Sequence, residues 1–201
     1  MTSQAEAQKI LGNRMVSLKE VKAIFCLTPI QCRDLDSVPF SRETLCEAPE
    51  SFRLVLDVGA SIADIQAFCK TWPDARIIMR PMLWPQDYSF YYERASPGWR
   101  LISTKPVQGS LNQGRDDQLR LVQKGRVVPL ARALVLLNMV MMLFRPGDEP
   151  VFKGVSVRTG DSELRGGQYV MAGRRMGDFA VDTCYPHPNQ YIGLGEELIP
   201  E

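Results

Sequence analysis

The longest apolar run of the chain, ALVLLNMVMMLF over residues 133–144, constrains the fold more than any other segment. Crossing a bilayer takes about 20 consecutive apolar residues, so this run is too short to span a membrane. It predicts a buried helix, with Pro129 in the first turn, where the missing N–H group costs nothing. Asn138 is expected to find a hydrogen-bond partner, because an unpaired buried amide costs about 1–3 kcal/mol. Residues 145–148, Arg-Pro-Gly-Asp, are expected to end the helix.

Composition indicates one ordinary globular domain in the cytoplasm. The 201 residues are 45% hydrophobic and 23% charged, and the net charge of +1 argues against strong non-specific binding to nucleic acid or anionic membranes. The cysteines have irregular spacing and no CxxC pair, which favours reduced thiols in a cytoplasmic protein. Residues 1–15 lack the apolar core of a signal peptide and predict a loosely packed N-terminal helix.

The single histidine, His187, excludes whole classes of metal chemistry. Zinc hydrolases with an HExxH motif, iron sites with two histidines and Cys2His2 zinc fingers all need a second histidine. The sequence also has no GxxxxGK[ST] phosphate-binding loop and no GxSxG nucleophile motif. We therefore predict neither a metal nor a cofactor.

The pattern of the remaining segments predicts an α+β fold. Residues 52–58 form an apolar strand, Ser61 and Asp64 match the capping box of a following helix, and residues 75–80 form a second strand. The last quarter alternates short strands with glycine-rich turns, which favours a mixed or antiparallel sheet. Further elements are expected at residues 99–104 (strand), 111–124 (helix), and 151–158, 168–172, 179–184 and 190–194 (strands). No repeat or linker divides the chain, so residues 1–201 are predicted to be one domain.

The C-terminal block resembles a family of uncharacterised bacterial proteins of about this length. Its segments are YVMAGRRMGD over residues 169–178 and PHPNQYIG over residues 186–193. The family carries a GSRRGDRRVPALW turn and strand and an NPHTWLG ending, and its RGRTPLT segment is approximated by residues 124–130. Here Gly173 runs directly into the arginine pair, and Tyr191 stands where the family has tryptophan. The resemblance implies a fold and a bacterial or phage origin, and it implies no chemistry.

Cys184, His187 and Asp182 are candidate catalytic residues. A thiolate beside an imidazole, with a carboxylate orienting the ring, is the arrangement of a cysteine nucleophile. Pro186 and Pro188 fix the backbone on both sides of His187, however, and such partners usually come from distant segments. The alternative is a histidine that is hydrogen-bonded within a turn.

Arg174 and Arg175 are candidate anion-binding residues, because two arginines in a glycine-flanked turn can fork onto a phosphate or carboxylate. The alternative is a hairpin turn with solvated arginines. Between residues 100 and 132, basic residues outnumber acidic ones, which keeps single-stranded nucleic acid as an unfavoured partner. The basic residues are Arg100, Lys105, Arg115, Arg120, Lys124, Arg126 and Arg132, against Asp116 and Asp117.

Trp84, Tyr88, Tyr91 and Tyr92 are candidates for a partner surface, because tyrosine, tryptophan and arginine concentrate at interfaces. They could equally cover the core under an irregular loop. We therefore predict a non-catalytic accessory protein that binds a ligand, a protein partner or a second copy of itself. One alternative is a small hydrolase, which would either use Cys184 and His187 or act on phosphate esters bound by Arg174 and Arg175. The second alternative is a weak nucleic-acid binder.

Overall fold

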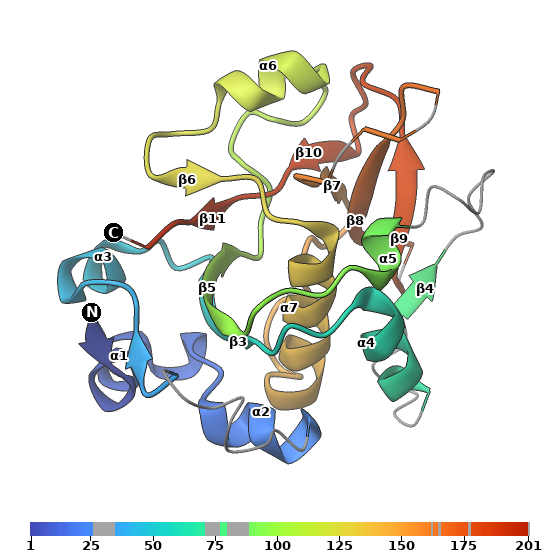
Figure 1. The fold of residues 1–201 in the computed structure, drawn as a ribbon. Helices are drawn as coiled ribbons and strands as arrows, with labels where there is room; N and C mark the ends of the chain where they lie inside the picture. The colour runs from blue at the N-terminus through green and yellow to red at the C-terminus, as the bar shows by residue number, and fades with distance from the viewer. Residues whose placement is uncertain are drawn as a thin grey trace.

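A computed structural model of the chain describes residues 1–25, 35–70, 77–79, 89–161, 163–164, 166–176 and 178–200. The helices are α1 (Gln4–Leu11), η1 (Gly12–Arg14, a 3-10 helix), α2 (Leu18–Phe25), α3 (Arg42–Glu47), α4 (Ile62–Cys69), α5 (Ser89–Tyr92), α6 (Arg115–Arg120) and α7 (Ala131–Phe144). The strands are β1 (Thr2–Ser3), β2 (Ser37–Val38), β3 (Phe52–Asp57), β4 (Ile77–Met79), β5 (Gly98–Ser103), β6 (Arg126–Val127), β7 (Ser156–Arg158), β8 (Tyr169–Met176), β9 (Asp178–Cys184), β10 (Ile192–Leu194) and β11 (Glu197–Leu198). Figure 1 shows their arrangement.

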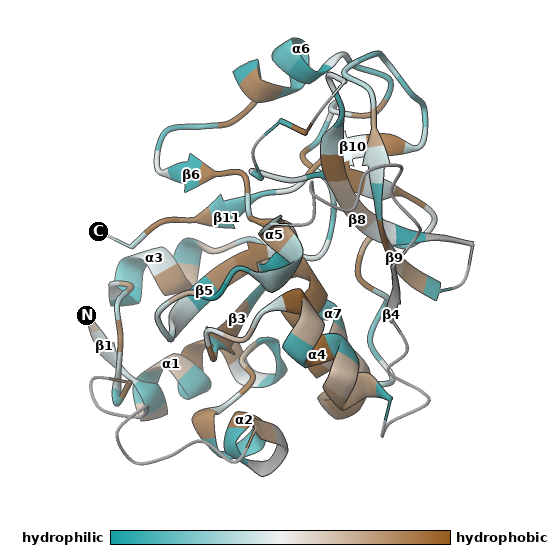
Figure 2. Cartoon of the chain, turned by 45° about the vertical axis from the view of Figure 1, so that its right-hand side comes forward, coloured by the Kyte–Doolittle hydropathy of each residue, from teal (hydrophilic) through white to brown (hydrophobic). Residues whose placement is uncertain are grey.

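Helix α7 lies at the centre of the molecule and is buried over most of its length. All its residues from Ala131 to Met141 are buried, and it contacts β3, α4, α5, β8 and β9. In Figure 2 it appears largely brown, in the middle of the fold. The predicted buried helix is confirmed, although Pro129 lies just before the N-cap residue, Leu130, and not within the first turn. No helix of the described residues has the length and apolar character that crossing a membrane requires.

Strands from two sheets pack against this helix. In the part of the chain that the structure describes, β3, β5, β11 and β6 form an antiparallel sheet in that order. The second sheet has the order β10-β7-β8-β9-β4 and is mixed, because β10 and β4 pair in parallel with β7 and β9. The predicted α+β single domain is therefore what the structure shows.

The predicted strand–helix–strand unit is present as β3, α4 and β4, but its two strands belong to different sheets. Ser61 caps α4, and Asp64 closes the predicted capping box. β3 pairs along its whole length with β5, whereas β4 pairs with β9. Since α4 packs on α7, the unit connects the two sheets across the central helix.

The N-terminal helix is packed more closely than its polar sequence predicts. In α1, Ala7 and Leu11 are buried in the main core, and Ser3 accepts a hydrogen bond from the backbone N–H of Glu6 at the helix start. The expectation of a loosely packed segment over residues 1–15 is therefore wrong. One apolar residue per turn is enough here, because α1 lies against α3 and η1.

Two further element boundaries differ from the sequence predictions. The helix expected over residues 111–124 is reduced to α6, because Gly114 caps its start and Gly125 adopts a positive φ of 81° in the turn that follows. Strand β8 is longer than expected and includes Arg174 and Arg175. The assignment of these two arginines to a turn is therefore wrong.

Candidate functional site

The C-terminal loop that carries His187 is held from inside by a buried arginine. Arg158 is 1% exposed and donates hydrogen bonds to the backbone carbonyls of Tyr185 (2.9 Å) and His187 (2.7 Å) and to the side chain of Gln118 (2.6 Å). The imidazole itself is exposed and stacks on the Tyr185 ring, with 6.4 Å between the ring centroids. The loop is thus fixed through its backbone, and the ring of His187 faces outward.

The structure does not join Cys184 to His187. Cys184 is buried beneath the loop, and burial raises the pKa of its thiol even though the Arg158 guanidinium nearby favours the thiolate. Both side chains are described, and no hydrogen bond connects them. Asp182 is half-buried and accepts a hydrogen bond from the backbone N–H of Thr183 (2.8 Å). These positions do not form the thiol–imidazole pair that a cysteine nucleophile needs.

Arg174 is directed inward by an irregularity in the β8–β9 hairpin. Gly173 lies opposite Ala180 and Met176 opposite Asp178, so two residues of β8 face the single residue Phe179 of β9. Such a bulge re-aims a side chain relative to regular alternation. The Arg174 guanidinium donates to Asn138 Oδ1 and to Met142 Sδ on α7, each at 3.1 Å.

The surroundings of Arg174 change the pKa of its guanidinium, and its contacts on α7 are with the neutral side chains of Asn138 and Met142. Burial lowers the pKa of Arg174, and the Asp178 carboxylate opposes that effect. Arg174 is half-buried and therefore not one of the solvated turn arginines considered above. Arg175 lies beside it on β8, and its side chain is outside the described part of the structure.

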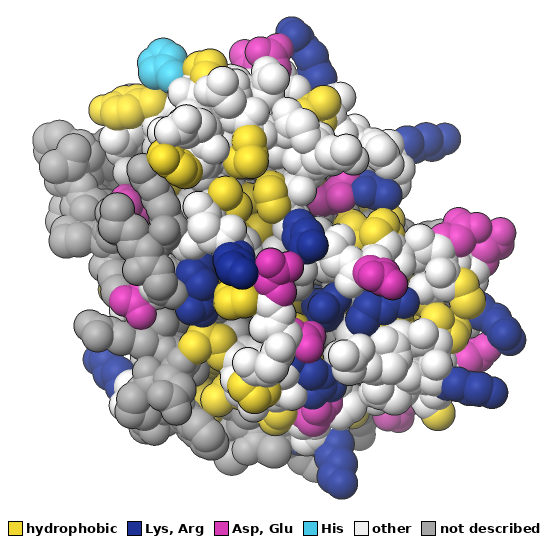
Figure 3. Space-filling view, turned by 180° about the vertical axis from the view of Figure 1, so that it is seen from behind, with side chains coloured by type: hydrophobic (Ala, Val, Ile, Leu, Met, Phe, Trp, Pro, Cys, Tyr) yellow, Lys and Arg dark blue, Asp and Glu magenta, His cyan; other side chains and the backbone are white. Residues whose placement is uncertain are grey.

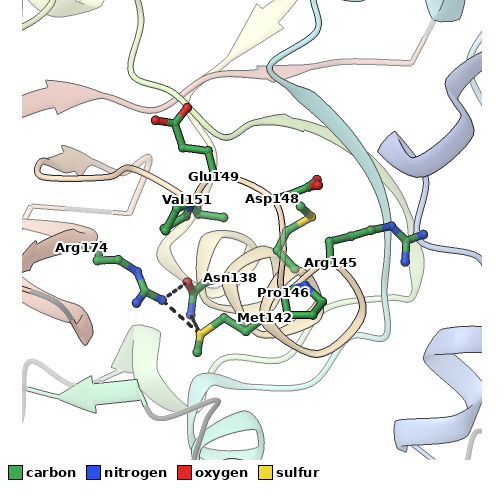
Figure 4. Close-up of a pocket in the computed structure, with 10 residues that line it drawn as sticks. Asn138, Met142, Arg145, Pro146, Asp148, Glu149, Val151 and Arg174 are labelled. Atoms are coloured by element: carbon green, nitrogen blue, oxygen red, sulfur yellow. Dashed lines mark hydrogen bonds between the residues drawn. The ribbon is translucent and has the colours of Figure 1, made fainter.

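Arg174 and Asn138 border a cavity of about 370 Å³ beside the C-terminal half of α7. Figure 4 shows the Arg174 guanidinium reaching Asn138 and Met142 at one edge of this cavity. The remaining lining combines apolar side chains with three charged ones from the helix end and the loop before β7. The lining residues are Asn138, Met141, Met142, Arg145, Pro146, Asp148, Glu149, Pro150, Val151 and Arg174.

Most charges at this cavity already have partners within the protein. Arg145 Nη1 lies 2.8 Å from the Glu20 carboxylate, and the same guanidinium donates to three backbone carbonyls. Asp148 lies 3.4 Å from Arg53. Glu149 lies at the exposed rim, and its ion pairs with the described residues are long, 3.5 Å to Lys105 and 3.9 Å to Lys153.

Little in the amino-acid sequence indicates this cavity. Residues 145–148 are expected from their sequence only to end the helix, which they do: Arg145 is the C-cap residue of α7. Asn138 is expected from its sequence only to find a hydrogen-bond partner. In the structure its Oδ1 accepts from Arg174, and its Nδ2 donates to Met142 Sδ at 3.5 Å. The one usable signal was the polar Asn138 in an otherwise apolar run.

Of the predicted aromatic surface, Trp84 and Tyr88 lie outside the described residues. Tyr91 and Tyr92 lie on α5 in an edge-to-face contact with 4.8 Å between ring centroids. The Tyr91 hydroxyl bonds the Gln66 side chain, whereas Tyr92 is 68% exposed. The described part of this stretch therefore presents one exposed aromatic ring.

Three of the seven basic residues between positions 100 and 132 are paired with buried carboxylates. Arg132 pairs with the buried Asp57 at 2.6 Å, and Arg100 pairs with both Asp57 and Glu197. Arg126 pairs in the same way with Glu196 at 2.7 Å. Figure 3 shows basic and acidic side chains interspersed on the face behind the view of Figure 1. Arg100, Arg126 and Arg132 thus supply internal ion pairs, whereas Lys105 and Arg120 are exposed.

Residues that could hold a metal do not gather in the described part of the chain. Among the residues described, no group of three or more histidine, cysteine, aspartate or glutamate side chains has the geometry of a metal site. Cys46, Cys69 and Cys184 are free thiols, and burial raises the pKa of Cys69 to about 11. Cys26 and Cys32 lie outside the described residues.

Comparison of the chain with protein-family models, with curated proteins and with solved structures finds no match. The resemblance of residues 169–193 to an uncharacterised bacterial family therefore stays a prediction.

Proposed function

We propose that this chain is a non-catalytic binding protein that holds a small carboxylate-bearing ligand in the cavity beside α7. The observation that carries this proposal is the position of the half-buried Arg174, whose guanidinium lies at the edge of the cavity and donates to Asn138 and Met142. A planar guanidinium matches a carboxylate through two parallel hydrogen bonds. In a partly desolvated position such a pair is stronger than it is at the surface.

The rest of the cavity supports a ligand with an apolar tail. Met141, Met142, Pro146 and Val151 supply apolar lining, and methionine side chains adapt to irregular shapes. The volume of about 370 Å³ is at the lower end of the range for small-molecule pockets. The site therefore suits a ligand of metabolite size with one anionic end.

A catalytic function receives less support from the geometry. Cys184 is buried with a raised pKa, and His187 points outward. Glu20 and Arg53, which lie next to the cavity, are engaged with Arg145 and Asp148. The proposal keeps the cytoplasmic location that the cysteine pattern favours, and the bacterial or phage origin that the resemblance implies.

The test is calorimetric titration of the protein with isocaproate, a branched aliphatic carboxylate. We expect saturable binding to the wild type and at least a tenfold loss of affinity in Arg174→Gln, since glutamine keeps a hydrogen bond to Asn138 but removes the charge. Arg120→Gln is the matched control, because Arg120 is an exposed arginine on α6. Equal binding by Arg174→Gln and wild type would overturn the proposal, as would no binding to the wild type at millimolar concentrations.

A further inference from the structure

We propose that residues 185–191, Tyr-Pro-His-Pro-Asn-Gln-Tyr, form a docking surface for a proline-rich peptide that carries a basic side chain. We call this segment the aromatic loop. It joins β9 to β10, and none of its residues lines the cavity beside α7. The surface is therefore separate from the carboxylate site, and binding at one does not require binding at the other.

The aromatic loop exposes three rings to solvent. Tyr185 and Tyr191 are 54% and 42% exposed, and His187 is exposed as well. The rings of Tyr185 and His187 lie close to parallel, with an interplanar angle of 28° and 6.4 Å between their centroids. Figure 3 shows the histidine, the single cyan side chain, projecting from the molecule with hydrophobic side chains beside it. Exposed rings that gather in one place are typical of a surface that binds a partner.

The backbone of the aromatic loop is fixed before any partner binds. Arg158 holds two of its carbonyls from inside. On the other side, the backbone N–H of Arg115 donates to the Pro186 carbonyl (2.9 Å), and that of Asn112 donates to the Asn189 carbonyl (3.1 Å). A loop that is already ordered loses less conformational entropy on binding than a flexible one does.

Flat aromatic surface suits a proline-rich segment. Such segments adopt the polyproline II helix, which forms without internal hydrogen bonds and docks on surfaces that are lined by aromatic rings. Leu111 adds aliphatic surface next to the loop: it is 39% exposed, and its Cδ2 lies 3.4 Å from the point that a Cβ on Gly193 would occupy. Successive pyrrolidine rings can therefore pack against neighbouring apolar groups of the protein.

A carboxylate beside the aromatic loop indicates that the peptide carries positive charge. Asp117 Oδ2 and the carbonyl of Pro186 lie 3.9 and 3.6 Å from one point, the position that a Cβ on Gly114 would occupy. Asp117 pairs with Arg120 on the same helix, and the two side chains are 57% and 77% exposed. Exposed pairs of this kind contribute little to stability, so a guanidinium on the peptide can bind Asp117 at small cost.

Two arginines near the loop are engaged with other groups of the protein. Arg158 is buried, and the Arg115 guanidinium lies over the Tyr169 ring, 4.1 Å from its centroid. The Tyr169 hydroxyl in turn donates to Glu163 (2.8 Å), so a second carboxylate lies on this side of the molecule. A single-stranded nucleic acid needs a positively charged groove along its backbone, and a basic peptide therefore fits this surface better.

The experiment is a calorimetric titration of the protein with three probes. The first is a decaproline peptide with one central proline replaced by arginine, the second has glutamine at that place, and the third is single-stranded oligothymidylate. We expect the arginine peptide to bind saturably below millimolar concentrations, about fivefold more tightly than the glutamine peptide. Tyr185→Ala should lower this affinity about tenfold, whereas Tyr185→Phe, which keeps the ring, should stay within about threefold of wild type. Tyr92→Ala removes an exposed tyrosine on α5 and should change nothing.

Asp117→Asn tests the charge of the peptide. We expect this variant to bind both peptides equally, with the affinity that wild type has for the glutamine peptide. Glu43→Gln removes an exposed carboxylate on α3 and should leave the preference for arginine intact. In an NMR titration of wild type with the arginine peptide, the chemical-shift changes should concentrate in residues 111–117 and 185–191.

Several results would overturn the proposal. These are no binding of the arginine peptide to wild type at millimolar concentrations, equal affinity for the two peptides, and shift changes that lie outside the aromatic loop. Tighter binding of oligothymidylate that is lost in Tyr185→Ala would show that the surface binds nucleic acid instead. Thermal melts of the variants should match wild type because Tyr185 and Asp117 are exposed, and the NMR titration needs no variant. Binding of isocaproate in the cavity is measured separately, so either proposal can fail without the other.

Discussion

Two arginines lie near opposite ends of helix α7, and their partners differ. Arg132 lies near its N-terminal end, and Arg174 lies beside its C-terminal half. At the N-terminal end, Arg132 is 3% exposed and both oxygens of the Asp57 carboxylate accept from its Nη1, at 2.6 and 2.7 Å. Arg100 extends this network from Asp57 to Glu197. Beside the C-terminal half, Arg174 donates to Asn138 Oδ1 and borders the cavity.

We propose that the first network serves the fold and that Arg174 serves binding. Removing ions from water costs several kcal/mol each, and only close pairing within the protein offsets that cost. The Asp57 network achieves such pairing without any ligand and so has a structural role. Arg174 borders the cavity, where we propose that it pairs with a ligand carboxylate.

The largest effect on stability is expected for Asp57→Asn. The substitution removes the carboxylate that balances the positive charges of Arg132 and Arg100. Removing one partner of a buried ion pair costs about 3–5 kcal/mol. The free energy of unfolding from urea titration measures the loss, with Asp116→Asn as the exposed control. A loss below about 1 kcal/mol would remove the distinction between the two ends of α7.

A smaller loss of about 2–3 kcal/mol is expected for Arg145→Met, since hydrogen bonds to charged groups contribute about 1.5–3 kcal/mol. Arg145 connects the end of α7 to Asn13, Met15 and Glu20 of the N-terminal segment. Hydrogen exchange should show faster exchange in α1 and α2 than in the central sheets. Uniform exchange across the protein would show that this arginine does not anchor the N-terminal segment.

Asp161→Asn is expected to change how stability depends on pH. Asp161 accepts a hydrogen bond from the backbone N–H of Ala131 at the start of α7, and burial raises the pKa of its carboxyl above the ordinary 3.8. The folded protein thus holds the proton more tightly than the unfolded chain, and the wild type loses stability as pH rises through this window. The variant lacks this loss, so its stability relative to wild type should improve as the pH rises above the ordinary carboxyl pKa of 3.8. Urea titrations across this range test the sign, and a relative stability that falls with pH would contradict it.

The smallest effect on stability is expected for Arg174→Gln, within about 1 kcal/mol of wild type. Burial lowers the pKa of Arg174, so its removal relieves a desolvation cost and offsets the lost hydrogen bonds. Thermal unfolding without ligand measures the change. A loss comparable to that of Asp57→Asn would place Arg174 with the structural arginines.

Local patterns in the sequence predicted individual helices and strands, but they did not predict which strands pair with one another. The apolar run of α7 and the capping box at Ser61 depend on neighbours within a few residues, and both were predicted. Whether β3 pairs with β4 or β5 depends on contacts across the whole chain, so the division into two sheets was missed.

The candidate site shows the same limit. Arg174 was identified from its glycine-flanked sequence, but its inward direction follows from the bulge, which regular alternation along a strand does not reveal. Cys184 and His187 drew attention because they are close in sequence, yet the strand end separates the buried thiol from the exposed ring. The cavity combines residues 138–151 with a strand far along the chain, so no spacing rule could indicate it.

The insertion of β11 between β5 and β6 also sets the order in which this chain is able to fold. Arg100 on β5 and Glu197 on β11 are separated by 97 positions, so β5 and β6 have no common neighbour until the ribosome has released residue 198. Until then both strands present unpaired edges, which are the usual templates for aggregation. Pairings between distant segments also slow folding. A chain that is cut before Glu197 therefore leaves a gap in the middle of the sheet and deprives Arg100 of one of its two carboxylates, so such fragments are natural targets for chaperones and proteases.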